Sequence, residues 1–128
     1  MALDFGRART GVAVSDPTGL IARPLGVVEH AANDAGLDEL ARLVREEEAE
    51  QVVVGHPLTL RGQRGQQARE TERFAAALRD RLDVPVVLFD ERFTTDLAQQ
   101  TPSPADEDAR AAAHLLSSYL AWSSAAPA

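Results

Sequence analysis

Short apolar runs alternate with helical patterns along the chain. Three apolar runs, at 1–5, 10–15 and 23–29, are separated by turns that contain Gly and Pro, and they predict three strands. Two later runs, 51–55 and 84–89, are rich in valine and lack polar alternation, as is typical of strands covered on both faces. The pattern therefore predicts five strands.

Three further stretches carry apolar residues at the spacing of one helix face, and they predict helices over 36–50, 66–82 and 105–122. Asn33 or Asp34 is placed to cap the first helix. The small, polar residues 123–128 are expected to form a flexible tail after a single domain over 1–122, since 128 residues suffice for one domain and not for two.

The element order is therefore β-β-β-α-β-α-β-α. Hairpin strands followed by strands separated by helices imply an α/β fold, a mixed five-stranded sheet with helices on both faces. This is the element order of the ribonuclease H-like fold, whose strands lie in the order 3-2-1-4-5. The periodicity alone leaves other three-layer α/β folds open.

Composition excludes several classes of function. The 20 acidic and 13 basic residues give a net charge of −7, which argues against a nucleic-acid-binding domain, and every basic residue is Arg. The absence of Cys excludes disulfides, zinc-thiolate centres, iron–sulfur clusters and a Cys nucleophile. No apolar run is long enough for a membrane span and no leader pattern is present, so we expect a cytoplasmic chain.

Acidic residues follow the predicted strands and precede the last helix. Asp4 ends the first strand, Glu91 follows the fifth, and 106–108 is an acidic run that opens the last helix. The ligand crevice of an open α/β sheet lies at the carboxyl ends of its strands, so Asp4 and Glu91 should face one region. Each acid could instead be an ordinary turn former or helix-start residue.

Converging carboxylates need compensation, because two charges 4 Å apart repel by about 4 kcal/mol at an effective dielectric of 20. Carboxylate oxygens suit Mg²⁺ or Mn²⁺, and a pair of such ions serves phosphodiester hydrolysis. The fifth strand lies roughly 10 Å from the first, so Glu91 reaches Asp4 only if the chain curls inward after Phe89. His56, which ends the fourth strand, could fill the gap as a metal or phosphate ligand, or be an exposed loop residue.

Arginines are expected at the same edge of the sheet, where their planar side chains would bind phosphates. Each could alternatively be a solvated surface charge. Thr94 could contact a phosphate or merely end a strand, and Glu70 and Glu72 are expected to pair along their own helix. The aromatic content of 5% favours recognition by phosphate geometry and shape rather than by base stacking. The candidate phosphate-binding arginines are Arg7, Arg9, Arg61, Arg64 and Arg92.

Four segments, 3–6, 11–17, 53–58 and 90–95, resemble the YqgF/RuvX family of RuvC-like proteins. These are small bacterial proteins of ribonuclease H fold, described as Holliday junction resolvases and as pre-16S rRNA nucleases. The resemblance extends over about 1–122 and implies that the metal-binding, catalytic acids are Asp4, Glu91 and Asp108. The last assignment rests on the Asp-x-x-Ala-Ala pattern that begins at Asp108.

The resemblance implies a metal-dependent endonuclease that cuts a DNA four-way junction or an rRNA precursor, and a homodimer would suit a two-fold junction. Two alternatives remain open at this stage. Residues 96–107 form a short, acidic segment where the family commonly has a basic one, which favours a non-catalytic binding module. The other alternative is a half-domain related to the actin-like ATPases, because their phosphate loop also begins with Asp-x-Gly, as at Asp4.

Overall fold

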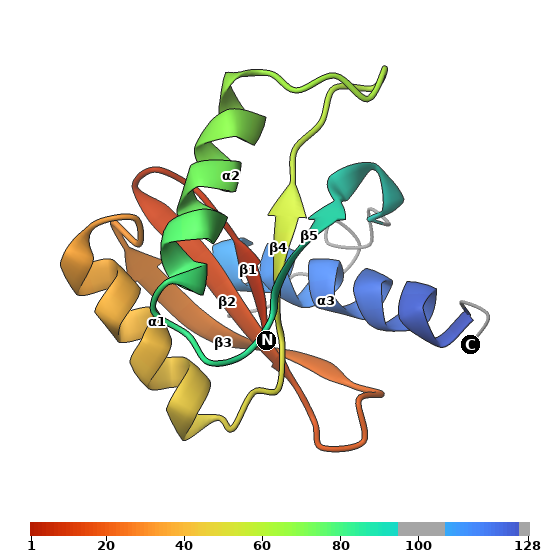
Figure 1. The fold of residues 1–128 in the computed structure, drawn as a ribbon. Helices are drawn as coiled ribbons and strands as arrows, with labels where there is room; N and C mark the ends of the chain where they lie inside the picture. The colour runs from red at the N-terminus through yellow and green to blue at the C-terminus, as the bar shows by residue number, and fades with distance from the viewer. Residues whose placement is uncertain (95–106, 126–128) are drawn as a thin grey trace.

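Five strands form one mixed sheet in the order β3-β2-β1-β4-β5, which confirms the predicted order (Figure 1). The computed structural model describes residues 1–94 and 107–125. The strands are β1 (Ala2–Asp4), β2 (Arg9–Ser15), β3 (Ala22–Glu29), β4 (Val52–His56) and β5 (Val86–Asp90).

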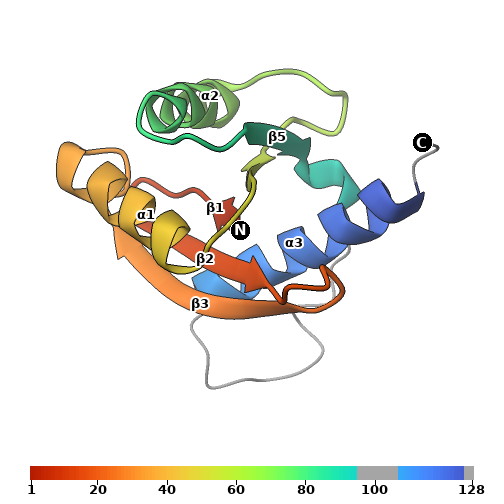
Figure 2. The same ribbon diagram turned by 60° about the horizontal axis from the view of Figure 1, so that its bottom comes forward.

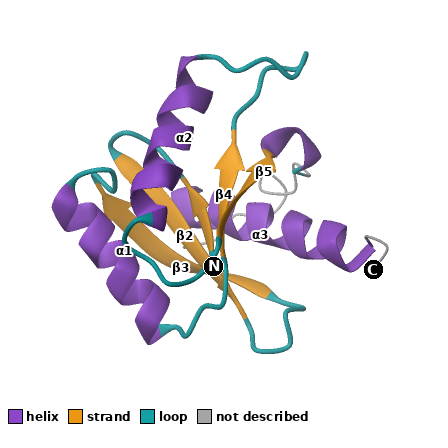
Figure 3. Cartoon of the chain, viewed as in Figure 1, coloured by secondary structure: helices purple, strands orange, loops and turns teal. Residues whose placement is uncertain are grey.

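Strand direction decides which residues share an edge of the sheet. β1 pairs antiparallel with β2, in a register that places Asp4 opposite Gly11. β1, β4 and β5 are parallel, and His56 lies opposite Asp90 at the last pair of β4 and β5. The carboxyl ends of these three strands therefore point the same way, as the arrows of β4 and β5 show in Figure 3, and the residues after them share one edge of the sheet.

Three helices cover the two faces of the sheet (Figure 2). α1 (Asp34–Glu46) and α2 (Gln66–Arg79) pack on one face, and α3 (Glu107–Ala125) crosses the other. Successive strand residues alternate between two cores, so Leu3 packs with the first pair of helices while Ala2 packs under α3. None of the described helices is long and apolar enough to cross a membrane.

Helix boundaries differ from the predicted ones for local reasons. The Asn33 side chain accepts a hydrogen bond from the Gly36 amide at 2.7 Å, which confirms the predicted cap. α1 ends at Glu46 rather than at residue 50, because Glu48 takes a left-handed conformation and turns the chain away. α3 continues to Ala125, so 123–125 are helical and not part of a flexible tail, while 126–128 lie outside the described residues.

Candidate active site

Asp4 occupies the last position of β1, at the carboxyl edge of the sheet. Its side chain is half-buried, and this burial, followed by the charge of Asp108, raises the pKa of the Asp4 carboxyl above its ordinary value. No salt bridge to Asp4 occurs within residues 1–94 and 107–125. The position therefore holds an acid whose ionised form lacks a compensating partner in the described chain.

Glu91 reaches the centre of the edge because the chain curls inward after β5. The one-turn 3₁₀ helix η1 (Glu91–Phe93) follows directly, and the Asp90 carboxylate caps it by accepting the Arg92 amide at 2.9 Å. The Glu91 side chain lies over Gly55 of β4, where an added Cβ would be 2.6 Å from Glu91 Oε1. Gly55 thus leaves the space in which Glu91 crosses the intervening strand, and the predicted inward curl is confirmed.

Burial also raises the pKa of Glu91, and the charge of Asp4 raises it further. Asp4 and Glu91 come from β1 and from the turn after β5, with β4 between them. The effect of the Asp4 charge on Glu91 agrees with the strand-end pattern, which predicted that the two carboxylates face one region.

Asp108 lies beside Asp4 because the first turn of α3 packs directly on β2. At Gly11, which is paired with Asp4, an added Cβ would overlap the Asp108 carbonyl oxygen. The Asp108 Oδ2 atom lies 2.8 Å from an Arg9 guanidinium nitrogen. The structure thus brings Asp108 near Asp4 but pairs it with an arginine that the sequence had suggested for phosphate binding.

We predict that Gly11→Ala destabilises the fold by about 1–3 kcal/mol or more, since the overlap involves helix backbone that cannot rotate away. The matched control is Gly26→Ala in β3, where an added Cβ meets no atom within 4 Å. Urea unfolding of both variants would measure the difference. Equal stability of the two would contradict the close packing of α3 on Gly11.

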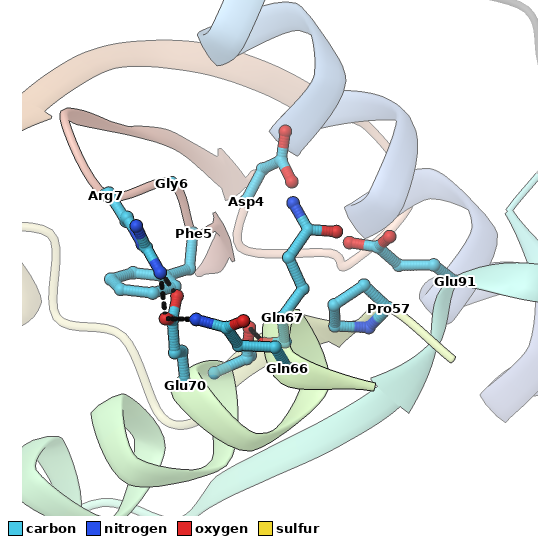
Figure 4. Close-up of a pocket in the computed structure, with 10 residues that line it drawn as sticks. Asp4, Phe5, Gly6, Arg7, Pro57, Gln66, Gln67, Glu70 and Glu91 are labelled. Carbon is cyan, nitrogen blue, oxygen red and sulfur yellow. Dashed lines mark hydrogen bonds and ion pairs between the residues drawn. The ribbon is translucent and has the colours of Figure 1, made fainter. Parts of the chain in front are cut away.

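A pocket of about 550 Å³ opens between the two acids and the start of α2. Figure 4 shows Asp4 and Glu91 on one side and the Gln67 side chain extending from α2 toward the space between them. Phe5 stacks on Phe74 with ring centroids 4.3 Å apart, which anchors the turn that follows β1. Gln67 is a pocket residue that the sequence does not indicate, because a polar residue in the first turn of a helix has the same pattern whether it faces a pocket or solvent. The remaining lining residues are Gly6, Arg7, Pro57, Gln66, Glu70 and Thr71.

Glu70 and Glu72 form their salt bridges with loop arginines, so the expected pairing along their own helix is met only in part, by the hydrogen bond of 3.2 Å that Glu70 accepts from Gln66. The Arg7 Nε atom donates to Glu70 Oε2 at 2.9 Å, and the Arg64 Nε atom donates to Glu72 Oε2 at 2.8 Å. These hydrogen bonds lower the pKa of each glutamate to about 2. The loops after β1 and β4 fold against the start of α2, so loop arginines reach both glutamates, and Glu70 binds Arg7 and Gln66 together.

The remaining candidate arginines divide into paired and exposed ones. Arg92 holds Asp90 through several hydrogen bonds, including one of 2.6 Å, while Arg61 is exposed. Arg7, Arg9 and Arg64 also form ion pairs with carboxylates. Most of the candidate arginines at this edge of the sheet are therefore paired with an acid.

His56 and Thr94 take positions that the sequence left open. His56 lies within β4 with its side chain 16% exposed, and its Nε2 atom is 2.7 Å from Glu72 Oε2, so it is not an exposed loop residue. The Thr94 amide donates to the Glu91 carbonyl at 3.0 Å, which closes η1, and its buried hydroxyl has no hydrogen-bond partner within the described chain. Thr94 therefore supports the turn that carries Glu91.

Within the described residues, no group of three or more Asp, Glu or His side chains is arranged to hold a metal ion. Asp4 and Glu91 line the pocket, but Asp108 does not. The fold thus brings two of the three predicted acids together and leaves the third adjacent.

The RuvX family, described as Holliday junction resolvase, matches residues 1–122. The chain belongs to this family. A relative from Chloroflexus aurantiacus, named "Putative pre-16S rRNA nuclease", is 45% identical over 100 residues, which cover 78% of this chain and 65% of the relative. A relative of the same name from Syntrophomonas wolfei is 36% identical over 129 residues, covering 94% of this chain and 92% of its own.

The fold of this RuvX-family chain is ribonuclease H-like. Among solved structures it is similar to T. thermophilus RuvC in complex with a Holliday junction substrate, with a TM-score of 0.63 and 17% identity over 96% of this chain and 93% of RuvC. Because the chain spans slightly less than two thirds of the Chloroflexus relative, its activity and substrates are treated below as proposals.

Proposed function

We propose that this RuvX-family chain is a metal-dependent endonuclease that hydrolyses phosphodiester bonds of structured nucleic acid. One observation carries the proposal: two half-buried carboxylates, Asp4 and Glu91, line one polar pocket without a salt bridge from any described residue. The reaction class is supported by the family description, Holliday junction resolvase, and by the relatives' name, "Putative pre-16S rRNA nuclease".

The donor set fits Mg²⁺ or Mn²⁺, which prefer carboxylate oxygens. Asp4, Glu91 and Asp108 would hold the metal. Burial destabilises the ionised carboxylates of Asp4 and Glu91, and a bound cation would offset that cost. When bound, such ions supply an activated water and stabilise the leaving oxygen of the phosphodiester. Asp108 would join the set by exchanging its contact with Arg9.

Other side chains would bind and orient the substrate. Arg7 stands in the pocket wall, and its guanidinium can form two parallel hydrogen bonds to a phosphate. Gln67 extends toward the acids and can donate from its amide to a phosphate oxygen. Outside the pocket, the nucleic-acid strand would be contacted by Arg61, Arg64 and Arg92. Thr94 would act indirectly, through the turn that it supports.

The test is cleavage of two substrates, a four-way DNA junction and a pre-16S rRNA fragment, with Mg²⁺, with Mn²⁺ and with chelator. Wild-type cleavage that needs the metal and disappears in Asp4→Asn is the expected result. The substrate that is cut selects between DNA and rRNA. Absence of metal-dependent cleavage of both would overturn the nuclease proposal.

A non-catalytic binding module is the second candidate, and the ion pair between Arg9 and Asp108 favours it. In that case Asp108 would serve α3 packing and the other acids would hold no metal. Binding of the same substrates that survives Asp4→Asn, without cleavage by the wild type, would support the module.

Glu70 is expected to weaken substrate binding by occupying the guanidinium of Arg7. We predict that Glu70→Gln tightens binding of a junction about 2- to 5-fold, because the phosphate no longer competes with a carboxylate. The control is Glu39→Gln, which makes the same charge change at an ion pair with Arg42 on α1. Fluorescence anisotropy at moderate salt measures both, and equal affinities would contradict competition at Arg7.

We further propose that the protein acts in the cytoplasm, where nucleic-acid substrates of either kind occur. A homodimer would suit a two-fold junction, because each copy would then place one pocket on one of two symmetry-related strands. Sedimentation of the chain with and without junction tests that assembly.

A further inference from the structure

Aromatic side chains are scarce in this chain, yet most of them gather at one place outside the pocket. The sequence contains six aromatic residues, four Phe, one Tyr and one Trp. Four of them form a cluster around the Phe89 ring, with centroids 6.0 Å to Phe93, 5.4 Å to Tyr119 and 5.7 Å to Trp122. The cluster joins the end of β5, η1 and the second half of α3.

Two members of the cluster face solvent. The Phe93 side chain is 58% exposed and Trp122 is 53% exposed, whereas Phe89 beneath them is 4% exposed. Tyr119 supports Trp122 at 6.0 Å and is itself held by a hydrogen bond from its hydroxyl to Gln51 Oε1. We call Phe93 and Trp122 together the aromatic platform, two exposed rings on a buried aromatic support.

The platform begins on the same turn as the proposed active site. Phe93 closes η1, the three-residue turn that starts with Glu91 and carries Arg92 between them. Figures 1 and 2 both place η1 beside the C-terminal half of α3. A nucleic-acid strand that leaves the pocket past Glu91 therefore meets the platform next.

Charge distinguishes the platform from the exposed apolar pair Leu20 and Ile21, and Leu60 is an isolated exposed leucine in a loop. From residue 111 to residue 125, α3 contains no Asp, Glu, Lys or Arg, in a chain with a net charge of −7. Leu20 and Ile21 are also exposed, but they follow Asp16, whose carboxylate accepts both of their amides. The α3 side of the platform therefore presents no carboxylate to a polyanion. Arg92, which is paired with Asp90, flanks Phe93, and exposed rings beside an Arg match an unpaired base and its phosphate.

We propose that Phe93 and Trp122 stack on unpaired bases of a nucleic-acid strand that passes from the pocket. This extends the proposed function by naming the substrate feature, unpaired nucleotides next to the cleaved bond, and it depends on nucleic-acid binding but not on catalysis. It also revises the expectation from composition that base stacking is absent, because tertiary packing concentrates the few rings on one surface.

The single tryptophan makes the test direct. Trp122 fluorescence is titrated with an oligothymidine strand, with a four-way junction and with a blunt duplex, all in chelator so that no cleavage occurs. The expected result is saturable quenching by the unpaired strand, at a concentration at least about 5-fold lower than for the duplex.

Variants then assign the effect to the platform, with affinity measured by the anisotropy of labelled oligothymidine. Phe93→Leu and Trp122→Leu are expected to weaken binding about 5- to 100-fold each, while Trp122→Phe retains most of it. Leu20→Ala is the matched control, because it removes an exposed apolar side chain elsewhere and should leave affinity unchanged.

Three outcomes would overturn the proposal. Equal quenching by duplex and unpaired strand would exclude stacking on unpaired bases. Unchanged affinity in Phe93→Leu and Trp122→Leu, with junction cleavage intact, would exclude a stacking role for the platform but would not contradict the nuclease proposal. Fluorescence that changes with protein concentration alone, together with sedimentation as a dimer, would assign the surface to a second copy of the chain.

Discussion

Asp4→Asn is expected to reduce metal-dependent cleavage more than about 100-fold while raising the thermal stability of the metal-free chain. Removing a group that only orients a metal ligand already lowers metal affinity or activity by about 10- to 100-fold, and Asp4 would itself be a ligand. The gain in stability follows because burial and the charge of Asp108 disfavour the ionised carboxyl of Asp4, and Asn carries no charge. We expect the midpoint of thermal unfolding to rise by about 2–4 °C.

The sign of the pH dependence follows from the raised pKa. An acid whose pKa is higher in the folded chain binds its proton more tightly there. Protonation of Asp4 therefore stabilises the folded chain, and this stabilisation is complete at a pH below 3.8, the pKa of the carboxyl in the unfolded chain. That effect is lost as pH rises through the folded pKa. The advantage of Asp4→Asn should therefore be absent in acid and grow toward neutral pH, in chelator.

Thermal unfolding across that pH range measures the effect, with Asp83→Asn as the control, since Asp83 is an exposed acid in the turn before β5. An Asp4→Asn variant that is less stable than the wild type at neutral pH would contradict the burial of an uncompensated charge. Added Mg²⁺ or Mn²⁺ should stabilise the wild type and leave Asp4→Asn nearly unchanged.

Gly55→Ala is expected to lower cleavage about 10- to 100-fold with little change in the free energy of unfolding. The new methyl group would be 2.6 Å from Glu91 Oε1 and 3.2 Å from Leu115 Cδ2, so the carboxylate must move away. Because the overlapping atom is the end of a flexible side chain, the strand and the core can stay in place. Activity assays and urea unfolding, run side by side, separate the two effects.

Gly26→Ala is again the matched control and should retain full activity, because its methyl group would meet open space. A second check uses the Glu91→Gln background, in which Gly55→Ala should cause no further loss if it acts through the Glu91 side chain. Additive losses in the double variant would show that Gly55 acts through another group.

Hydrophobic periodicity was enough to predict the strands and helices and, through the resemblance, the sheet order. The valine run of β4 is buried on both faces, as its lack of polar alternation indicated. Helix ends were less predictable. The stop of α1 depends on Glu48 adopting a left-handed conformation, which a glutamate rarely takes and no local pattern announces.

The two central acids of the candidate site were also predictable, because a residue that follows a parallel strand must lie at the carboxyl edge of the sheet. Gln67 was not, since a polar residue in the first turn of a helix has the same sequence pattern whether it faces a pocket or solvent. The arginine partners of Glu70 and Glu72 were not predictable either, because both glutamates have plausible partners on their own helix and the pairs with Arg7 and Arg64 depend on how two loops fold against α2.

The sequence by itself determined the elements, their order and the candidate acids, because periodicity and strand ends are local properties of the chain. Only the tertiary structure decided how Glu91 crosses β4, since that depends on the space above Gly55. It also decided that Arg7 pairs with Glu70, since that ion pair joins segments 63 residues apart in the sequence. It also gathered Phe93 and Trp122 onto Phe89, since β5 and α3 meet only when the sheet and its covering helix pack together.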